Sequence, residues 1–168
     1  MAPHIPDGDF VEYMAAHALW LRRVAYLLCQ DWDQADDLAQ TAMTKLYAHW
    51  PRARKVENLD AYLRTILVNT FLSEARRPWW KRIALLDHVA DDLPAETPDL
   101  DASLDVRDAL ADLPPRQRAT LVLRYYCDLT VEQTAAELGC SQGTVKSNTS
   151  RGLASLRVLL EARDGVSA

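Results

Sequence analysis

A segment near the C-terminus, residues 129–160, constrains the fold more than any other part of the chain. It reads LTVEQTAAELGCSQGTVKSNTSRGLASLRVLL, and its residues predict two helices around a tight turn. Thr130 and Gln133 have the spacing of a capping box at a helix start, and Gly139 can supply the positive φ that ends this helix. Ser141 is then placed to cap the second helix. Two helices joined in this way predict a helix-turn-helix, an element that enters the DNA major groove.

The second of these helices is predicted to have an inward and an outward side. Apolar or small residues three or four positions apart form a stripe with a repeat of about seven residues, and this stripe should pack inward: Val145, Thr149, Gly152, Leu156, and Leu159 or Leu160. Hydroxyl and cationic side chains occupy the opposite side: Thr144, Lys146, Ser147, Ser150 and Arg151. Arginine and lysine reach guanine acceptors or phosphates, and a helix N-terminus favours a nearby phosphate. The outward side is therefore a candidate DNA-reading surface, and a merely solvated polar face is the alternative.

The first half of the chain also has helical periodicity. Leucine and alanine recur at helical spacing, glycine is scarce at 5 residues, and runs of β-branched residues are few. We expect helices over residues 10–28, from an N-cap at Asp33 to about residue 49, and from Asn58 to about residue 77. The fold class is therefore predicted to be all-α.

Negative charge is concentrated in one segment that divides the chain. Residues 87–112 carry nine acidic residues and one arginine, whereas residues 1–86 have a net charge of +1 and residues 113–168 have +2. The first part of the acidic segment has no apolar stripe long enough to pack, so we expect a flexible linker that ends in a short helix from about Ser103. The prediction is two small helical domains, 1–86 and 113–168, joined by this acidic linker. The overall charge of −5 therefore does not exclude a DNA-binding second domain.

The second domain is predicted to open with a helix at Pro114 and Pro115, since proline is tolerated in a first helical turn. The sequence that follows, RQRATLVLRYY, has amphipathic spacing. Leu121 and Tyr125 lie four residues apart, so we expect both on one face of this helix.

Several classes of function lack the residues that they require. The three cysteines, Cys29, Cys127 and Cys140, form no CxxC pair and have no close histidine, which argues against a disulfide framework and a zinc site. No HExxH, GxSxG or P-loop motif is present, so a small helical enzyme is the weaker alternative. No apolar run approaches ~18 residues, and the N-terminus lacks a basic segment before an apolar one. We expect a cytoplasmic protein without catalytic residues, metal, cofactor or membrane attachment.

A second candidate surface is predicted in the first domain. The loop at residues 51–58, PRARKVEN, is basic, and the helix after it presents an amide and further cations; the residues are Arg52, Arg54, Lys55, Arg64, Asn69, Arg76 and Arg77. Cations neutralise phosphate, an amide can bond a base edge, and the following Trp79 and Trp80 have apolar faces for stacking. This combination suits a splayed single-stranded base, and ordinary packing of the two tryptophans is the alternative.

Three segments in this order resemble the extracytoplasmic-function (ECF) sigma factors, the smallest bacterial RNA polymerase specificity subunits. DQADDLAQTAMTKLYAHW is similar to their polymerase-binding helix, and NLDAYLRTILVNTFLSEARR is similar to their minus-ten-reading helix. Residues 113–157, from LPPRQRATL to RGLASLR, are similar to their minus-thirty-five domain. The resemblance covers nearly all of the chain, with the acidic linker in between. It implies a protein that recognises two promoter elements and stabilises strand opening by trapping unstacked bases.

The resemblance also implies a role for each surface. Polymerase core, through its clamp coiled coil, would be bound by Asp37, Gln40 and Thr41, and the flap would be a further polymerase contact. A flipped minus-ten base would be captured by Asn69 and the loop 52–57, which contains Arg52, Arg54 and Lys55. Arg76 and Arg77 would hold the backbone of the same strand, and Arg64 would be a further contact. The minus-thirty-five duplex would be read by Thr144, Lys146, Ser147, Ser150 and Arg151. The linker would follow the RNA exit path, and an anti-sigma factor would cover both domains of a chain that is monomeric when free.

Three positions depart from the family pattern. Thr41 stands where many relatives have glutamate, and Asn148 stands where many have arginine. Many relatives also have a further basic residue where this chain has Gly152 or Leu153. Fewer cations on the reading helix predict weaker phosphate binding, so promoter binding should depend on polymerase. Two non-enzyme alternatives stay open. One is a DNA-binding regulator like the two-component responders, although residues 1–86 lack the strand–helix alternation of a receiver domain. The other is an interaction module that binds an anti-sigma factor without supporting transcription.

Overall fold

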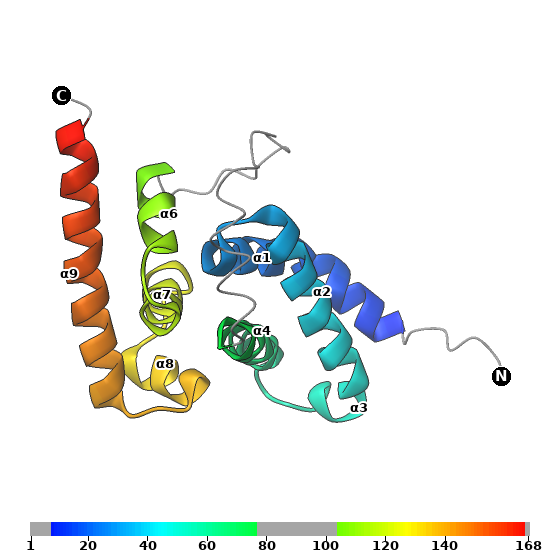
Figure 1. Cartoon of the computed structure of the whole chain (residues 1–168). Helices are drawn as coiled ribbons and strands as arrows, with labels where there is room; N and C mark the ends of the chain where they lie inside the picture. The colour runs from blue at the N-terminus through cyan, green and yellow to red at the C-terminus, as the bar shows by residue number, and fades with distance from the viewer. Residues whose placement is uncertain (1–7, 77–103, 167–168) are drawn as a thin grey trace.

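The computed structural model describes residues 8–76 and 104–166, and the regular secondary structure in these two ranges is entirely helical. The N-terminal module, residues 8–76, contains α1 (Gly8–Cys29), α2 (Trp32–Ala48), α3 (Trp50–Ala53) and α4 (Leu59–Ala75). The C-terminal module, residues 104–166, contains α6 (Leu104–Ala111), α7 (Pro115–Leu121), the π-helical turn η2 (Val122–Tyr126), α8 (Val131–Leu138) and α9 (Gln142–Val166). The all-α prediction is confirmed (Figure 1).

The helix boundaries of the C-terminal module follow the predicted capping residues. The Thr130 hydroxyl accepts from the Gln133 backbone N–H at 3.1 Å, and the Gln133 side chain accepts from the Thr130 N–H at 2.9 Å, so the capping box is complete. Gly139 ends α8 with φ of 63°, in the left-handed region that glycine enters at little cost. The Ser141 hydroxyl accepts from the Thr144 N–H at 3.1 Å at the start of α9. The helix-turn-helix prediction is therefore confirmed in its local detail.

The predicted N-cap of the second helix is wrong by two residues. Asp31, not Asp33, caps α2, and its carboxylate accepts from the Gln34 N–H at 2.9 Å. Gln30 ends α1 in the left-handed region with φ of 59°, so the connection between the two helices is only two residues long. Trp32 enters the first turn of α2, where its ring stacks on Tyr26 with centroids 3.9 Å apart.

The prediction that Leu121 and Tyr125 share one face is also wrong. Leu121 is buried, whereas 59% of Tyr125 is exposed. The α-helix changes to a π-helical turn at Val122, and a π-turn bonds to the fifth rather than the fourth residue. The i, i+4 relationship between Leu121 and Tyr125 is therefore lost, and the tyrosine turns toward solvent.

One continuous hydrophobic core joins the two modules. In the N-terminal module α1 packs on α2, and α2 packs on α4. In the C-terminal module the long α9 lies along α6, α7 and α8 (Figure 1). The modules meet where α4 packs on α7 and α8, and where α1 packs on α6 and α7. Buried residues of both modules belong to one cluster, from Leu28 and Phe71 on one side to Leu113 and Leu123 on the other.

The short helix expected at the end of the acidic segment is present as α6, and it packs against α9. Arg163 of α9 forms ion pairs with Asp108 at 3.3 Å and with Asp112 at 3.4 Å. The rest of the predicted linker lies outside the described residues, as do Arg77, Trp79 and Trp80. The predicted domain boundaries at residues 86 and 113 stay predictions.

Candidate nucleic-acid and protein interfaces

The polar side of α2 forms the first candidate surface. Asp36 points toward α1, where its carboxylate accepts from Arg22 at 2.6 Å. The neighbouring Asp37 and the residue one turn later, Gln40, are exposed. Buried Leu38 and Ala42 hold this helix on the core, so the direction of the polar side is fixed by packing. An acidic and an amide group on a rigid helix can receive a basic partner.

Thr41 contributes less to this surface than its position suggested. It is half-buried, and its hydroxyl donates to the Asp37 carbonyl oxygen at 2.9 Å. Thr44 makes the same contact one turn on, donating to the Gln40 carbonyl oxygen at 2.9 Å. With their protons engaged within the helix, both hydroxyls are left mainly as hydrogen-bond acceptors.

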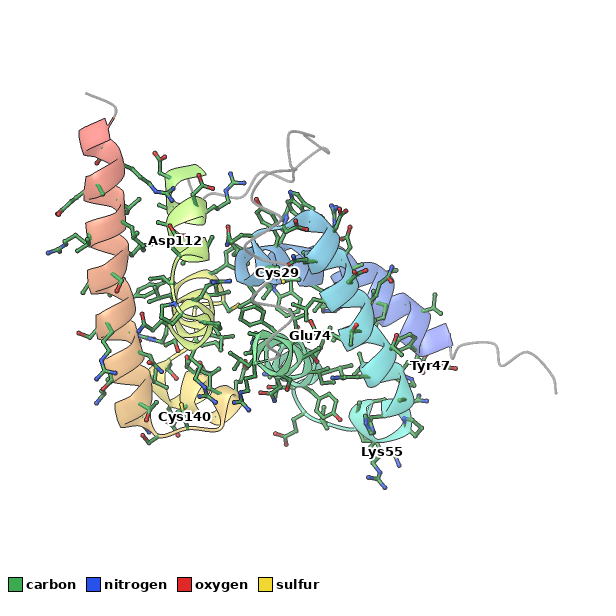
Figure 2. All side chains as sticks on the ribbon, in the orientation of Figure 1. Cys29, Tyr47, Lys55, Glu74, Asp112 and Cys140 are labelled. Atoms are coloured by element: carbon green, nitrogen blue, oxygen red, sulfur yellow. The ribbon has the colours of Figure 1, made fainter. Side chains whose placement is uncertain are left out.

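The basic loop between α3 and α4 forms the second candidate surface. Trp50 and Ala53 are buried and anchor α3, and Phe10 packs edge-on against Trp50 with centroids 5.2 Å apart. Arg52 and Lys55 are exposed beside this anchor, and Arg54 pairs with Asp9 at 2.7 Å. Lys55 is labelled at the tip of this loop in Figure 2. A cationic loop on a packed base is suited to hold a phosphate chain.

The predicted minus-ten residues of α4 lie on two different sides of the helix. Asn69 and Arg76 are both exposed and are seven residues apart, so they share one side. Arg64 precedes Asn69 by five residues, which places it roughly 140° around the helix at ~100° per residue. The structure therefore groups Asn69 with Arg76 and directs Arg64 toward the C-terminal module.

The outward side of α9 forms the third candidate surface. All five predicted reading residues are exposed in this structure: Thr144, Lys146, Ser147, Ser150 and Arg151. The opposite side is anchored by Val145, which is completely buried, and by Gly152. A Cβ atom built on Gly152 would lie 3.1 Å from a methyl group of Leu121, so α9 approaches α7 more closely there than a larger residue permits. Packing at these two points fixes which side of α9 faces outward.

Arg64 pairs across the module boundary with Glu137 of α8. The Arg64 Nε donates to Glu137 Oε2 at 2.9 Å, and its Nη2 donates to Oε1 at 2.5 Å. The two side chains are only 11% and 8% exposed. Burial opposes the charge of Arg64, but the hydrogen bonds and the charge of Glu137 outweigh it and raise the arginine pKa. Sequence reasoning missed Glu137, whose only signal was an acidic residue between the apolar neighbours of α8.

Arg118 of α7 makes a second contact between the modules. Its guanidinium donates to the Leu28 carbonyl oxygen of α1 at 2.6 Å and to the carbonyl oxygens of Ala111 and Leu113 at 2.9 Å. Burial lowers the pKa of Arg118, and the nearby Asp112 partly offsets this. Its guanidinium carbon lies 5.8 Å from the ring centre of Phe71 in α4. Figure 2 shows side chains filling the space between α4 and the α7–α8 region.

In residues 8–76 and 104–166, no helix combines the length and the apolar character needed to cross a bilayer. In the same ranges, no group of three or more histidine, cysteine, aspartate or glutamate side chains could hold a metal ion.

Two family models match the chain, one on each module. The model described as Sigma-70 region 2 matches residues 13–81, and the model described as Sigma-70, region 4 matches residues 103–156. The RNA polymerase sigma-E factor of Streptomyces coelicolor is 39% identical over 162 residues, which cover 93% of this chain and 88% of the relative. The ECF RNA polymerase sigma factor EcfG of Rhodopseudomonas palustris is 36% identical over 147 residues, which cover 83% of this chain and 78% of the relative.

Solved structures give the same relationship. The sigma factor RpoE of Bartonella quintana, in complex with the anti-sigma factor NepR, has a TM-score of 0.71 and is 32% identical. That match covers 92% of this chain and 98% of the solved chain. A structure of CnrH in complex with the cytosolic domain of CnrY has a TM-score of 0.59 at 22% identity, which shows a shared fold.

Proposed function

The chain belongs to the extracytoplasmic-function sigma factors of RNA polymerase, and on that premise we propose which of its surfaces bind polymerase, promoter and regulator. As a sigma factor, it directs promoter-specific transcription initiation. We propose that it does no covalent chemistry itself and acts in the cytoplasm with core polymerase, which carries out the synthesis of RNA.

The polar side of α2 is proposed to dock on the polymerase clamp. Asp37 and Gln40 are exposed there, while Asp36 is occupied by Arg22. A clamp surface with basic side chains would pair with Asp37 and donate to the side-chain oxygen of Gln40. Thr41 would contribute van der Waals contact and an acceptor oxygen. A hydrogen bond to this neutral oxygen is weaker than a hydrogen bond to a charged carboxylate.

The two DNA surfaces are proposed to act in sequence. The outward side of α9 binds the minus-thirty-five duplex in its major groove, with Lys146 and Arg151 on guanine or phosphate and the hydroxyls on base edges. The α3–α4 loop and Asn69 then capture a minus-ten base that has left the stack. Unstacking and unpairing cost a few kcal/mol for each flipped base, and contacts in the loop offset that cost. Captured bases stabilise the opened strands.

An anti-sigma factor is proposed as the regulator of this chain. Its relative RpoE is solved with the anti-sigma factor NepR, and this chain matches 98% of that RpoE chain. A partner that covers both modules would block access to polymerase and promoter together. We infer that the chain is monomeric apart from these partners.

One observation carries the proposal: two exposed surfaces suited to nucleic acid lie on separate modules, one on α9 and one at the α3–α4 loop. Run-off transcription with core polymerase on a promoter library tests it. The chain should add transcripts that start at a defined set of promoters. If core alone and core with this protein give the same transcripts, the sigma function is refuted.

Matched variants separate the proposed surfaces in the same assay. The double variant Lys146→Ala/Arg151→Ala should still co-purify with core polymerase but lose promoter-specific transcripts. The double variant Asp37→Ala/Gln40→Ala should lose co-purification with core. If each pair of substitutions affects both readouts equally, the division of roles between α2 and α9 is wrong.

A further inference from the structure

In this structure the two modules pack against each other, an arrangement called closed below. In the closed arrangement the two DNA-binding surfaces are too near each other to read both promoter elements at once. Elements about 25 base pairs apart are separated by about 85 Å along B-DNA, at ~3.4 Å per base pair. A compact chain of this size has a radius of gyration of about 15 Å. The segment 77–103 has 27 residues and can span at most about 90 Å at ~3.3 Å per residue. Separation of the modules is therefore both required for promoter reading and permitted by the chain.

The Arg64–Glu137 ion pair opposes this separation. It connects α4 to α8 with three hydrogen bonds from one guanidinium, and both side chains are shielded from solvent. When the modules separate, the bidentate contact between Arg64 and Glu137 is broken, and each charge is hydrated separately instead. Shielding also makes the pair less sensitive to salt than a surface ion pair.

The same pair makes one cation unavailable to DNA. Arg64 is among the minus-ten contacts predicted from the sequence, yet the Glu137 carboxylate occupies its donors in the closed arrangement. A carboxylate and a phosphate present similar paired oxygen acceptors to a guanidinium. Glu137 therefore holds Arg64 as a DNA phosphate would, and the two contacts exclude each other.

We propose that Glu137 is an intramolecular latch, which holds the free chain in the closed arrangement through Arg64 and releases this arginine when core polymerase separates the modules. This inference rests on the proposed sigma function. It adds that the chain restrains itself before any regulator binds. Arg118 donates to carbonyl oxygens of both modules and therefore also stabilises the closed arrangement. Unlike Arg64, it is not among the predicted DNA contacts.

Small-angle X-ray scattering of the full chain, with Glu137→Gln and the matched control Glu132→Gln, tests the latch. Both substitutions remove one negative charge from α8, but Glu132 is exposed at the first turn of the helix. Wild type and Glu132→Gln should have the radius of gyration of a closed chain, about 15 Å. Glu137→Gln should have a larger radius of gyration, with its helical circular dichroism unchanged. The ratio of closed to open chains should fall at least about tenfold, because the buried charge of Arg64 loses its partner. A folded Glu137→Gln that stays as compact as wild type overturns the latch, and so does an expanded wild type.

The charge-swapped variant Arg64→Glu/Glu137→Arg covers the case in which Glu137→Gln does not fold. The swap should restore the helical signal and the compact radius, since the ion pair is re-formed in the opposite direction. A swapped chain that is folded but expanded contradicts the latch. A swapped chain that stays unfolded also contradicts it, because the pair would then serve folding rather than gating.

Transcription by the same preparations separates failure of the latch from failure of the sigma function. Glu137→Gln should reach half-maximal transcription at up to about tenfold lower core polymerase concentration, since more of the chain is already competent to bind. If wild type directs transcription but scattering shows no opening in Glu137→Gln, only the latch is wrong. If no preparation directs transcription, the sigma function is wrong, and the scattering result alone decides the latch.

Discussion

Arg118 of α7 donates to the carbonyl oxygen of Leu28, 2.6 Å away in the last turn of α1. The last carbonyl groups of a helix have no partner within that helix. The same guanidinium also donates to Ala111, the last residue of α6. One arginine therefore caps the C-terminal ends of two helices from different modules, at the centre of their interface.

Replacing Arg118 by methionine should destabilise the protein strongly. Methionine retains the apolar stem, but it leaves three carbonyl oxygens without their donor in a region shielded from water. We expect the free energy of unfolding to fall by about 2–4 kcal/mol, since each unsatisfied buried group costs roughly 1–3 kcal/mol and some regain water. Urea denaturation measures this loss. Arg116→Met, at an exposed position two residues earlier, should change stability by less than ~0.5 kcal/mol.

Local features of the fold were predictable from the sequence because short-range chemistry decides them. The Thr130–Gln133 capping box and the left-handed Gly139 depend on neighbours within a few residues, and both are observed. The exposed side of α9 was predicted from the apolar repeat on its opposite side, and that repeat does pack on α7 in the structure. Asp31 and Asp33 were both competent caps by residue type, and the local sequence does not distinguish them; in the structure Asp31 caps α2, and the next residue, Trp32, stacks on Tyr26.

Contacts between the modules were not predictable in the same way. Arg64 and Glu137 lie 73 residues apart, and nothing in either local pattern indicates that they meet. A polar residue at the edge of an apolar stripe is usually solvated, so Glu137 and Arg118 gave no separate signal. The exposed position of Tyr125 depends on a π-helical turn, which periodicity at 3.6 residues does not detect.

Gly152 should tolerate alanine less well than Gly143, although both lie in α9. A Cβ atom at Gly152 would meet the buried Leu121 side chain at 3.1 Å, whereas at Gly143 it would meet only the Ser141 hydroxyl at 3.8 Å. Alanine is favoured over glycine by up to ~1 kcal/mol within a helix. We expect Gly143→Ala to stabilise the chain by about 0.5 kcal/mol. In Gly152→Ala this gain is opposed by overpacking against Leu121, which costs about 1–3 kcal/mol, so this variant should not be stabilised. Thermal and urea unfolding of the two variants compare them, and equal stabilisation of both would contradict the close approach of α9 to α7.

Cys29 and Cys127 should react slowly with alkylating reagents while the protein is folded. Burial raises the pKa of the Cys29 thiol to about 12 and that of the Cys127 thiol to about 11, from an ordinary value of 9.0. Because the thiolate is the nucleophile, reaction with iodoacetamide at pH 8 should be at least about 100-fold slower than in urea. Mass spectrometry of digested protein measures each site. Comparable rates in folded and unfolded protein would show that these thiols are accessible.

The same two thiols should make stability depend on alkaline pH. A pKa that is raised on folding stabilises the native state below the unfolded pKa, and this contribution is lost as pH rises through the folded value. Stability should therefore fall between about pH 9 and 12, and Cys29→Ala should reduce the slope of this fall. Urea denaturation of both proteins across this range is the measurement. An unchanged slope in Cys29→Ala would exclude Cys29 as a contributor.

Arg151→Ala should weaken binding to minus-thirty-five duplexes in holoenzyme. Arg151 is exposed on the outward side of α9, one turn after Ser147. If its guanidinium bonds a base edge, the loss should be about 1–3 kcal/mol and confined to duplexes with the preferred base at one position. Fluorescence anisotropy on a set of single-base variants measures both quantities. Arg157→Ala, exposed further along α9, is the matched control and should have a smaller effect. An equal loss on every duplex would identify Arg151 as a phosphate contact.

Asn69→Ala should impair strand opening without weakening the first contact with duplex DNA. The Asn69 side chain is exposed on the same side of α4 as Arg76, where its amide can bond the edge of an unstacked base. Losing a hydrogen bond of this kind costs roughly 1–1.5 kcal/mol, so open-complex formation should fall about tenfold. Fluorescence of 2-aminopurine at the minus-ten position follows unstacking in holoenzyme, and anisotropy on closed duplex follows initial binding. Ser73→Ala, one turn further on the same side of α4, is the matched control and should leave both signals near wild type. If Asn69→Ala lowers duplex binding as much as it lowers unstacking, the amide holds backbone, and base capture belongs to residues of the α3–α4 loop.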